Sequence, residues 1–281
     1  MPSGLKKIFR SVLVAGVALL LFFAFPTQAY AGEVIKIGGV GSALGTMKLL
    51  ASAFEKKHPG IRVEVLSSIG SPGALKAVPE GGVDIGLAGK IFTDKELGQG
   101  LSVVEYARTP FIFVTRKEIE QKGLTTAEII KIYRGEKETW PNGERIRWIL
   151  HPAKESDTLI AKGLSAEVAK ALDNALSKRG IMFALTDQEN LDLIEKTPGA
   201  FGYTTLTQII SEKRRVRVLS LNGVLPSGKT LAAGSYPLYK PLFMITKKVQ
   251  SDKVKKFIDF VRSEEGARIL RDTGNIVSGG R

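Results

Sequence analysis

Hydroxyl groups follow three apolar stretches of this chain, at points where a strand is expected to pass into a helix. The three turns read VGSALG, IGSPGA and KESDTL, and they place Ser42, Ser71, Ser156 and Thr158 near the starts of helices. The first amides of a helix have no partner within the helix, and the helix dipole favours negative charge at that end. Hydroxyls and free amides together can therefore hold an oxyanion.

The second turn carries the fullest set of these features. Ser71 is expected to be the N-cap, and Pro72 the first helical residue, where its missing N–H costs nothing. Gly70 and Gly73 would let a ligand approach the backbone closely. Taken alone, this turn favours a serine that only caps its own helix, but three such turns in one chain favour an anion site.

A nucleotide site is the alternative to an oxyanion site at these turns. Residues 222–230 read NGVLPSGKT and match the phosphate loop GxxxxGK[ST] of nucleotide-binding proteins. The loop needs a long helix after it, whose amides hold the phosphates. Here LAAGSYP follows, and Gly234 and Pro237 exclude a helix of ordinary length. We therefore expect the match to be accidental.

Catalytic and metal centres find little support in the composition. The chain has two histidines and no cysteine, so a dense metal cluster is not expected, although a carboxylate site stays open. His58 lies in a helix stop and His151 stands alone, so neither is an obvious base for a serine nucleophile. We expect a protein that is not an enzyme, with no catalytic residue, no metal and no cofactor.

The first 31 residues predict a cleavable secretory signal peptide. Lys6, Lys7 and Arg10 precede an uncharged apolar run over 12–25, and the run ends in a small-residue cleavage pattern at 29–31. The apolar run is shorter than the roughly 20 residues that a bilayer span needs, which disfavours the alternative of a retained anchor. We therefore expect an exported, soluble, periplasmic protein whose core forms without disulfides.

Charge and composition describe an ordinary globular protein with a basic surface. The 281 residues carry a formal charge of +13, which falls to +10 without the three basic leader residues. Such a field favours anionic partners in general. The densest basic segment, 212–217, has no interleaved aromatic residue, so a solvated face is expected there and no nucleic-acid partner.

The elements that position the three turns alternate between strands and helices. Strands are expected at 33–40, 61–67 and 83–89, with helices between them, which is the pattern of an α/β fold. Further along, Thr125 and Glu128 have the spacing of a capping box. Gly135 is expected to end that helix.

Two extended passages that contain proline, near 108–110 and 236–241, divide the chain. Each is expected to be a strand that crosses between two lobes. The first lobe would comprise residues 32–108 plus 240–281, and the second residues 109–239, with the leader at 1–31. The two lobes would then be joined by two hinge strands.

Taken in order, several segments resemble the phosphate-binding proteins of ABC transporters. They are VGSALG, FEKKHPGIRVEVLSSIGSPGALKAVPEGGVDIGLAGK, LTTAEIIKIYRGEKETWPNG, ESDTL, TPGAFGYTTL and NGVLPSGKTLAAGSYPLYKPLFMITKK. Together they cover nearly the whole chain after the leader, and YPLYKPLF is among the most specific. The resemblance implies a two-lobed periplasmic-binding-protein type II fold that closes over an oxyanion, a monomer, and an inner-membrane ABC permease as partner.

Carried over residue by residue, the resemblance assigns Ser42 to the first binding loop, Ser71 to the second, and Ser156 and Thr158 to the third. Asp84 matches an acidic position in VDIG. A carboxylate in the site would repel a fully ionised anion and accept a hydrogen bond from a protonated one, which would select phosphate over sulfate. The alternative is that Asp84 only caps the next turn.

The chain departs from the family pattern at four positions. Ala43 replaces a hydroxyl residue, Lys90 replaces an arginine, Asp157 replaces the glycine of SGT, and His151 stands near the expected arginine. Because an imidazole lacks the charge and the bidentate geometry of arginine, the choice of anion stays open. Molybdate or tungstate are alternatives to phosphate, and a sensory or partner-binding protein with the same fold is the alternative function.

Overall fold

The computed structural model describes residues 32–93, 96, 98 and 100–278. The predicted signal peptide, residues 1–31, lies outside the described residues. Residues Glu33–Arg281 form one compact unit. No helix in the described part of the chain is both long enough and apolar enough to cross a membrane.

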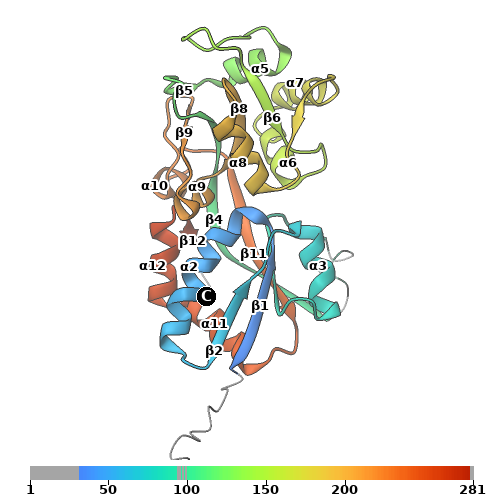
Figure 1. Ribbon diagram of the computed structural model, residues 1–281, viewed down its shortest axis with the longest axis vertical. Coiled ribbons are helices and arrows are strands. Elements are labelled where there is room, and N and C mark those ends of the chain that lie inside the picture. The colour runs from blue at the N-terminus through green and yellow to red at the C-terminus, as the bar shows by residue number, and fades with distance from the viewer. Residues whose placement is uncertain (1–31, 94–95, 97, 99, 279–281) are drawn as a thin grey trace, which may run out of the picture. The chain divides into compact units, whose positions relative to one another are not determined.

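Strands and helices alternate through this unit (Figure 1). The strands are β1 (Glu33–Gly39), β2 (Ile61–Val65), β3 (Ile85–Ala88), β4 (Leu101–Arg116), β5 (Gly123–Leu124), β6 (Arg147–Leu150), β7 (Met182–Phe183), β8 (Ala200–Thr205), β9 (Val216–Val218), β10 (Ser220–Leu221), β11 (Tyr239–Lys247) and β12 (Ile276–Val277). The helices are α2 (Gly41–Lys57), α3 (Gly70–Glu80), α5 (Thr126–Arg134), α6 (Ser156–Lys162), α7 (Ala166–Leu176), α8 (Asp187–Lys196), α9 (Leu206–Glu212), α10 (Gly228–Ala232), α11 (Asp252–Arg262) and α12 (Glu264–Asp272).

One sheet runs through both halves of the unit. Its order is β2-β1-β3-β11-β4-β8-β6-β7, and β9 and β12 also pair with β4. β1 pairs in parallel with β2 and β3, whereas β11 is antiparallel to both of its neighbours. The predicted α/β class is confirmed, because α2 and α3 connect the parallel strands as crossover helices.

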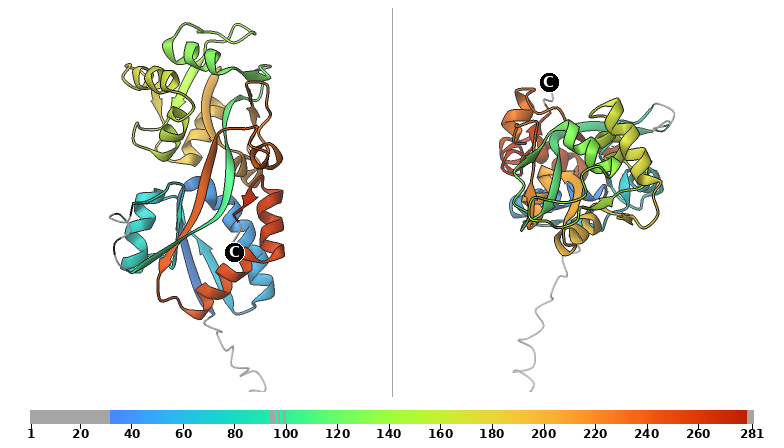
Figure 2. Two further views of the ribbon diagram at one scale, coloured as in Figure 1. Left: turned by 180° about the vertical axis from the view of Figure 1, so that it is seen from behind. Right: turned by 90° about the horizontal axis from the view of Figure 1, so that it is seen from above.

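The two long strands β4 and β11 lie side by side and pass from one half to the other (Figure 2). The extended passage expected near 108–110 lies within β4, which is a single strand of 16 residues. Pro110 lies opposite Tyr239, and from Phe111 onward β4 pairs with β8 instead. A residue without an N–H is tolerated there because the strand changes its hydrogen-bonding partner at this point.

Hydrophobic cores lie on either side of this crossing. One contains buried residues between Phe111 and Leu238. The others contain residues between Ile35 and Ala107 together with residues between Leu242 and Leu270. The apolar residues of each half therefore pack within that half, although the sheet is continuous.

Three helices have the features that the local sequence predicted. Thr125 and Glu128 form a reciprocal capping box at the start of α5, and Gly135 ends the helix with φ of 81°. In α2, Met47, Leu50 and Phe54 recur at helical spacing and are fully buried. The helix after the phosphate-loop pattern is α10, which has only five residues. The structure thus confirms that no long helix follows that pattern.

Candidate functional site

A cavity of about 370 Å³ lies between the amino ends of α3 and α6. Four of the residues predicted from the sequence line it, namely Gly70, Ser71, His151 and Ser156. Ser42, Asp84 and Thr158 are not among the lining residues. The structure therefore brings together parts of the second and third predicted loops, whereas the first loop contributes Val40.

Ser71 lines the cavity but is not the N-cap of its helix. α3 begins one residue earlier, at Gly70, with Ile69 in the cap position and no capping side chain. The Ser71 hydroxyl accepts a hydrogen bond from the Gly89 amide at 3.0 Å. The predicted N-cap role is therefore wrong, because this hydroxyl joins α3 to the end of β3 instead. Gly70 has φ of 68°, a conformation that favours glycine.

Ser42 lies in the first turn of α2 and is completely buried. Its hydroxyl has no hydrogen-bond partner among the described residues. The first turn of α2 contains no acidic residue of its own. The carboxylate of Asp187, from α8, lies against the backbone of this turn at Gly41.

The third loop divides between the cavity and the core. Ser156 begins α6 and lines the cavity. The Thr158 hydroxyl donates to the carbonyl of His151 at 3.1 Å and lies 2.8 Å from the hydroxyl of Tyr203. Both bonds are buried, so Thr158 fixes the loop against β8 and does not face the cavity. The sequence could not separate these two roles, because both residues stand at a helix start.

Asp84 is placed differently from the sequence expectation. Its carboxylate accepts a hydrogen bond from the Lys36 amide on β1 at 2.8 Å, and it lies 4.0 Å from the ammonium of Lys253. It precedes β3, whereas the cavity lies beyond the other end of that strand, near Lys90. Asp84 therefore joins the edges of neighbouring strands and is not among the residues that line the cavity.

His151 is buried and lines the cavity. Its Nδ1 lies 3.0 Å from the carbonyl of Ala184, which can only accept, so Nδ1 carries the proton. Nε2 has no partner among the described residues and is an acceptor in the neutral ring. The loop where an arginine was expected thus places one unpartnered imidazole nitrogen at the cavity.

Three buried charged side chains lie beside His151, and the sequence reasoning singled out only one of them. Lys240 on β11 is 1% exposed. Its ammonium forms an ion pair with the Oδ1 of Asp157 and lies 3.6 Å from the Oδ1 of Asp187. The Oδ2 of Asp157 has no partner among the described residues. Asp157 thus points inward, and Lys240 offsets the charge that it brings to the cavity.

The pKa values of this cluster reflect opposing effects. Burial by itself raises the pKa of Asp187, but the charge of Lys240 and a hydrogen bond from the Ser42 amide more than offset it, so the pKa is lowered. Burial lowers the pKa of Lys240, yet Asp157 and Asp187 raise it above its ordinary value. Asp187 and Lys240 are therefore charged at neutral pH.

Ligand atoms of His151, Asp157 and Asp187 lie within 4.8 Å of one another, as a metal site would require. The composition did not predict this cluster. The ammonium of Lys240 already contacts both carboxylates and supplies a cation at this position. A divalent ion would have to share the carboxylates with that ammonium, which is electrostatically unfavourable.

Lys240 has a sequence signal that could have been recognised. It is the one charged residue within the apolar segment PLYKPLFMIT. An added Cβ at Gly89 would overlap the Cε of Lys240, so this glycine is required for the lysine stem to pass. Asp187 has no comparable signal, because an acidic residue in the first turn of a helix is common.

The rim of the cavity adds positive charge. Lys90 and Lys154 both line it, and Glu155 lines it as well. Lys90 pairs with Glu96 at 2.5 Å and lies over the ring of Phe92. The cavity thus combines cationic rim residues and the amino end of α3 with buried acceptors, a combination that suits a negatively charged ligand that also carries a proton.

A larger cavity of about 630 Å³ lies within the half that contains residues 111–238, beside Trp148 and Lys178. Its basic lining includes Arg145, Arg147 and Arg179. None of its lining residues holds a buried polar side-chain atom without a partner, as far as the described residues show. We therefore take the smaller cavity, which contains such atoms, as the candidate site.

Comparisons with known proteins show the family of the chain. A family model described as the PBP superfamily domain matches residues 26–265. The chain is 27% identical over 252 residues to the phosphate-binding protein PstS of Bacillus subtilis (strain 168), covering 86% of this chain and 80% of that protein. It is 24% identical over 252 residues to PstS of Borreliella burgdorferi, covering 86% of this chain and 89% of that protein.

A solved structure from Clostridium perfringens, assigned as a phosphate ABC transporter substrate-binding protein and containing bound phosphate, has the same fold. The TM-score is 0.74 with 24% identity, covering 88% of this chain and 100% of the other. The predicted fold class and the resemblance seen in the sequence motifs are thereby confirmed.

Proposed function

The chain belongs to the PBP superfamily domain family, and from this premise we propose that it is a solute-binding protein that captures an oxyanion, phosphate in the first place, for an ABC importer. The similarity to two proteins called phosphate-binding protein PstS supports the choice of ligand. Binding and delivery require no catalytic residue, metal or cofactor in this chain.

The observation that carries the proposal is the lining of the 370 Å³ cavity. The start of α3, where no side chain caps the amides, lines the cavity together with Ser71, Lys90 and Lys154. These are the donors that hold an oxyanion at a helix amino end. Ser156 contributes a further hydroxyl from the opposite side.

The buried acceptors support a ligand that keeps a proton. Asp157 Oδ2 and His151 Nε2 have no partner among the described residues. A hydrogen phosphate can donate to such an acceptor, whereas sulfate at neutral pH has no proton to donate and would be repelled. We propose that Asp157 has the discriminating role that the sequence reasoning gave to Asp84.

Calorimetric titrations of phosphate, sulfate, molybdate and tungstate test this assignment. The wild-type protein should bind phosphate more tightly than the other three, and Asp157→Asn should narrow the margin over sulfate. Asp173→Asn is a matched control, because that carboxylate lies on an exposed helix face and pairs with Lys162. Tighter binding of a fully ionised oxyanion by the wild type would exclude phosphate as the cognate ligand. No binding of any of the four would favour a sensory or partner-binding role.

We propose further that residues 32–108 plus 240–281 and residues 109–239 act as two lobes that close on the ligand. Support comes from the hydrophobic cores, which separate near Pro110 and Pro241. β4 and β11 would be the hinges. Small-angle scattering should show a smaller radius of gyration with saturating phosphate, and an unchanged value together with demonstrated binding would contradict the closure.

The location and the partners complete the proposal. An exported monomer, processed after residue 31, would meet an inner-membrane permease outside the cytoplasm. Fractionation of cells that produce the full chain, with mass spectrometry of the mature amino terminus, tests the export. Recovery of the uncleaved chain from the cytoplasm would contradict it.

A further inference from the structure

The amino end of α2 is filled by a side chain from the other half of the unit. Asp187 is the first residue of α8, where Thr186 is the N-cap. A Cβ placed on Gly41 would lie 2.7 Å from Asp187 Oδ2 and 2.5 Å from Gln188 Oε1. The amino ends of α2 and α8 therefore meet at Gly41, where only a residue without a side chain fits.

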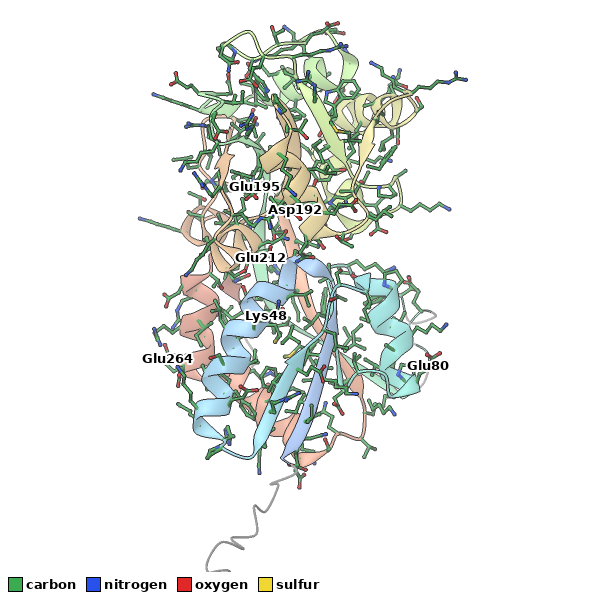
Figure 3. All side chains as sticks on the ribbon, in the orientation of Figure 1. Lys48, Glu80, Asp192, Glu195, Glu212 and Glu264 are labelled. Atoms are coloured by element: carbon green, nitrogen blue, oxygen red, sulfur yellow. The ribbon has the colours of Figure 1, made fainter. Side chains whose placement is uncertain are left out.

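Neighbouring contacts hold this junction together. Gln188 Nε2 donates to the carbonyl of Gly41 at 3.0 Å and to Glu212 Oε1 at 2.8 Å. Glu212 ends α9 and, together with Gln188, contacts α2; Figure 3 labels it near Lys48. Burial raises the pKa of Glu212, although its bonds to Gln188 and Gln208 oppose this effect. The α2 end is thus covered by groups from α8 and α9.

The position that Asp187 occupies has the properties of an anion site. α2 has 17 residues and no acidic residue in its first turn, so its dipole is not offset from within. The buried Ser42 hydroxyl beside it has no partner among the described residues. The comparable amino end of α3 is open to the cavity, since Gly70 and Ser71 line it.

Asp187 also contacts Lys240, the buried cation beside the cavity. Its Oδ1 lies 3.6 Å from the ammonium of Lys240, and Asp187 itself lines the cavity. A bound oxyanion would seek the same two groups, the α2 amides and the lysine ammonium. The carboxylate therefore stands beside two groups that would also stabilise a ligand oxygen.

We propose that Asp187 is an internal competitor for the oxyanion, a residue that sets ligand affinity by occupying the α2 end in the absence of ligand. This rests on the proposed oxyanion binding. Removing the charge of Asp187 should strengthen binding, because it replaces the charged acceptor at the α2 amides by a weaker neutral one and leaves Lys240 paired with Asp157 alone. We expect Asp187→Asn to bind phosphate at least about tenfold more tightly than the wild type at low ionic strength.

The matched control is Asp192→Asn, which removes a carboxylate from the same helix. Asp192 pairs with Arg214 and does not line the cavity, and Figure 3 labels it on α8. Arg214 keeps Glu195 as a partner at 3.2 Å. This control should bind phosphate as the wild type does.

The experiment has two arms, both on the mature chain. Without ligand, hydrogen exchange of the Ser42 amide should become faster in Asp187→Asn and stay unchanged in Asp192→Asn. With ligand, calorimetric titration of phosphate should show the tighter binding of Asp187→Asn. Should that variant fail to fold by circular dichroism, Asp187→Ser replaces it in both arms.

If the Ser42 amide exchanges its hydrogen at the same rate in Asp187→Asn as in the wild type, the claim that Asp187 occupies the amino end of α2 is wrong. Equal or weaker phosphate binding by the Asp187 variant would overturn the competition. If neither the wild type nor any variant binds phosphate, the proposed function fails, whereas the exchange arm still decides where the Asp187 carboxylate lies.

Discussion

Replacing Lys240 by methionine should destabilise the protein strongly at neutral pH. The ammonium is fully buried and is the counter-ion of Asp157 and Asp187. Methionine fills a similar volume but leaves two buried carboxylates without it. Removing one partner of a buried ion pair costs about 3–5 kcal/mol, because the remaining charge stays desolvated.

This cost can be converted into a melting temperature. For a folded chain of this size, each kcal/mol shifts the midpoint by about 2–4 °C, so the variant should melt about 6–20 °C below the wild type. Lys57→Met is the control, since Lys57 pairs with Glu265 on the surface with 56% of its side chain exposed. It should cost less than about 1 kcal/mol.

The pH dependence separates the lost charge pair from a packing defect. In the wild type the pKa of Asp187 is lowered, so its contribution to stability is full at neutral pH and is lost as the pH falls through the folded-state value. Without Lys240, burial dominates and raises that pKa, so the variant regains stability as the pH falls. The difference between the two proteins should therefore narrow between pH 7 and pH 4.

Urea titrations at several pH values, with circular dichroism as the signal, measure this difference. Adding Asp157→Asn and Asp187→Asn to the methionine variant should restore most of the loss, because the buried charges then disappear together. A loss below about 1 kcal/mol at pH 7, or a loss that does not change with pH, would refute the reasoning that Lys240 balances buried carboxylates.

Three further substitutions probe the candidate site and its surroundings. Ser71→Ala should weaken phosphate binding about five- to tenfold by calorimetry, since it removes a hydroxyl from the cavity lining; unchanged affinity would place the ligand elsewhere. Thr158→Val should lower the free energy of unfolding by about 1–2 kcal/mol in urea and leave phosphate affinity within about twofold, because its hydroxyl bonds only within the core. A large loss of phosphate affinity in this variant would show that Thr158 contacts the ligand, as the sequence predicted. Titration with Mg-ATP should give no saturable heat, because α10 has five residues; binding that Lys229→Ala abolishes would contradict this.

The sequence alone was sufficient for features whose causes are local. The capping box of Thr125 and Glu128 and the glycine stop at Gly135 depend on residues a few positions apart. The spacing of Met47, Leu50 and Phe54 likewise reports which face of one helix is buried. The alternation of such elements predicted the α/β class, and ordered motifs over the whole chain predicted the family.

The tertiary structure alone decided which of the marked residues share a cavity. Asp84 and Lys90 belong to one short segment, yet they lie at opposite ends of β3, and only Lys90 lines the cavity. Thr158 is only two residues from Ser156, but its side chain points into the core, where its hydroxyl contacts the hydroxyl of Tyr203. The hydrophobic pattern predicts which face of a strand or helix is buried. It does not specify which end of a strand lies next to the other lobe.

The ion pair of Lys240 and Asp157 joins residues that are 83 positions apart, through a crossing of β11 past the start of α6. The contact of Asp187 with Gly41 likewise joins helices that are far apart in the sequence, α8 and α2. Asp157 and Asp187 in isolation look like ordinary surface residues, because aspartate is rarely buried without a partner. Only the fold supplies the partner, so the buried charges of this site were decided by tertiary contacts that no local pattern contains.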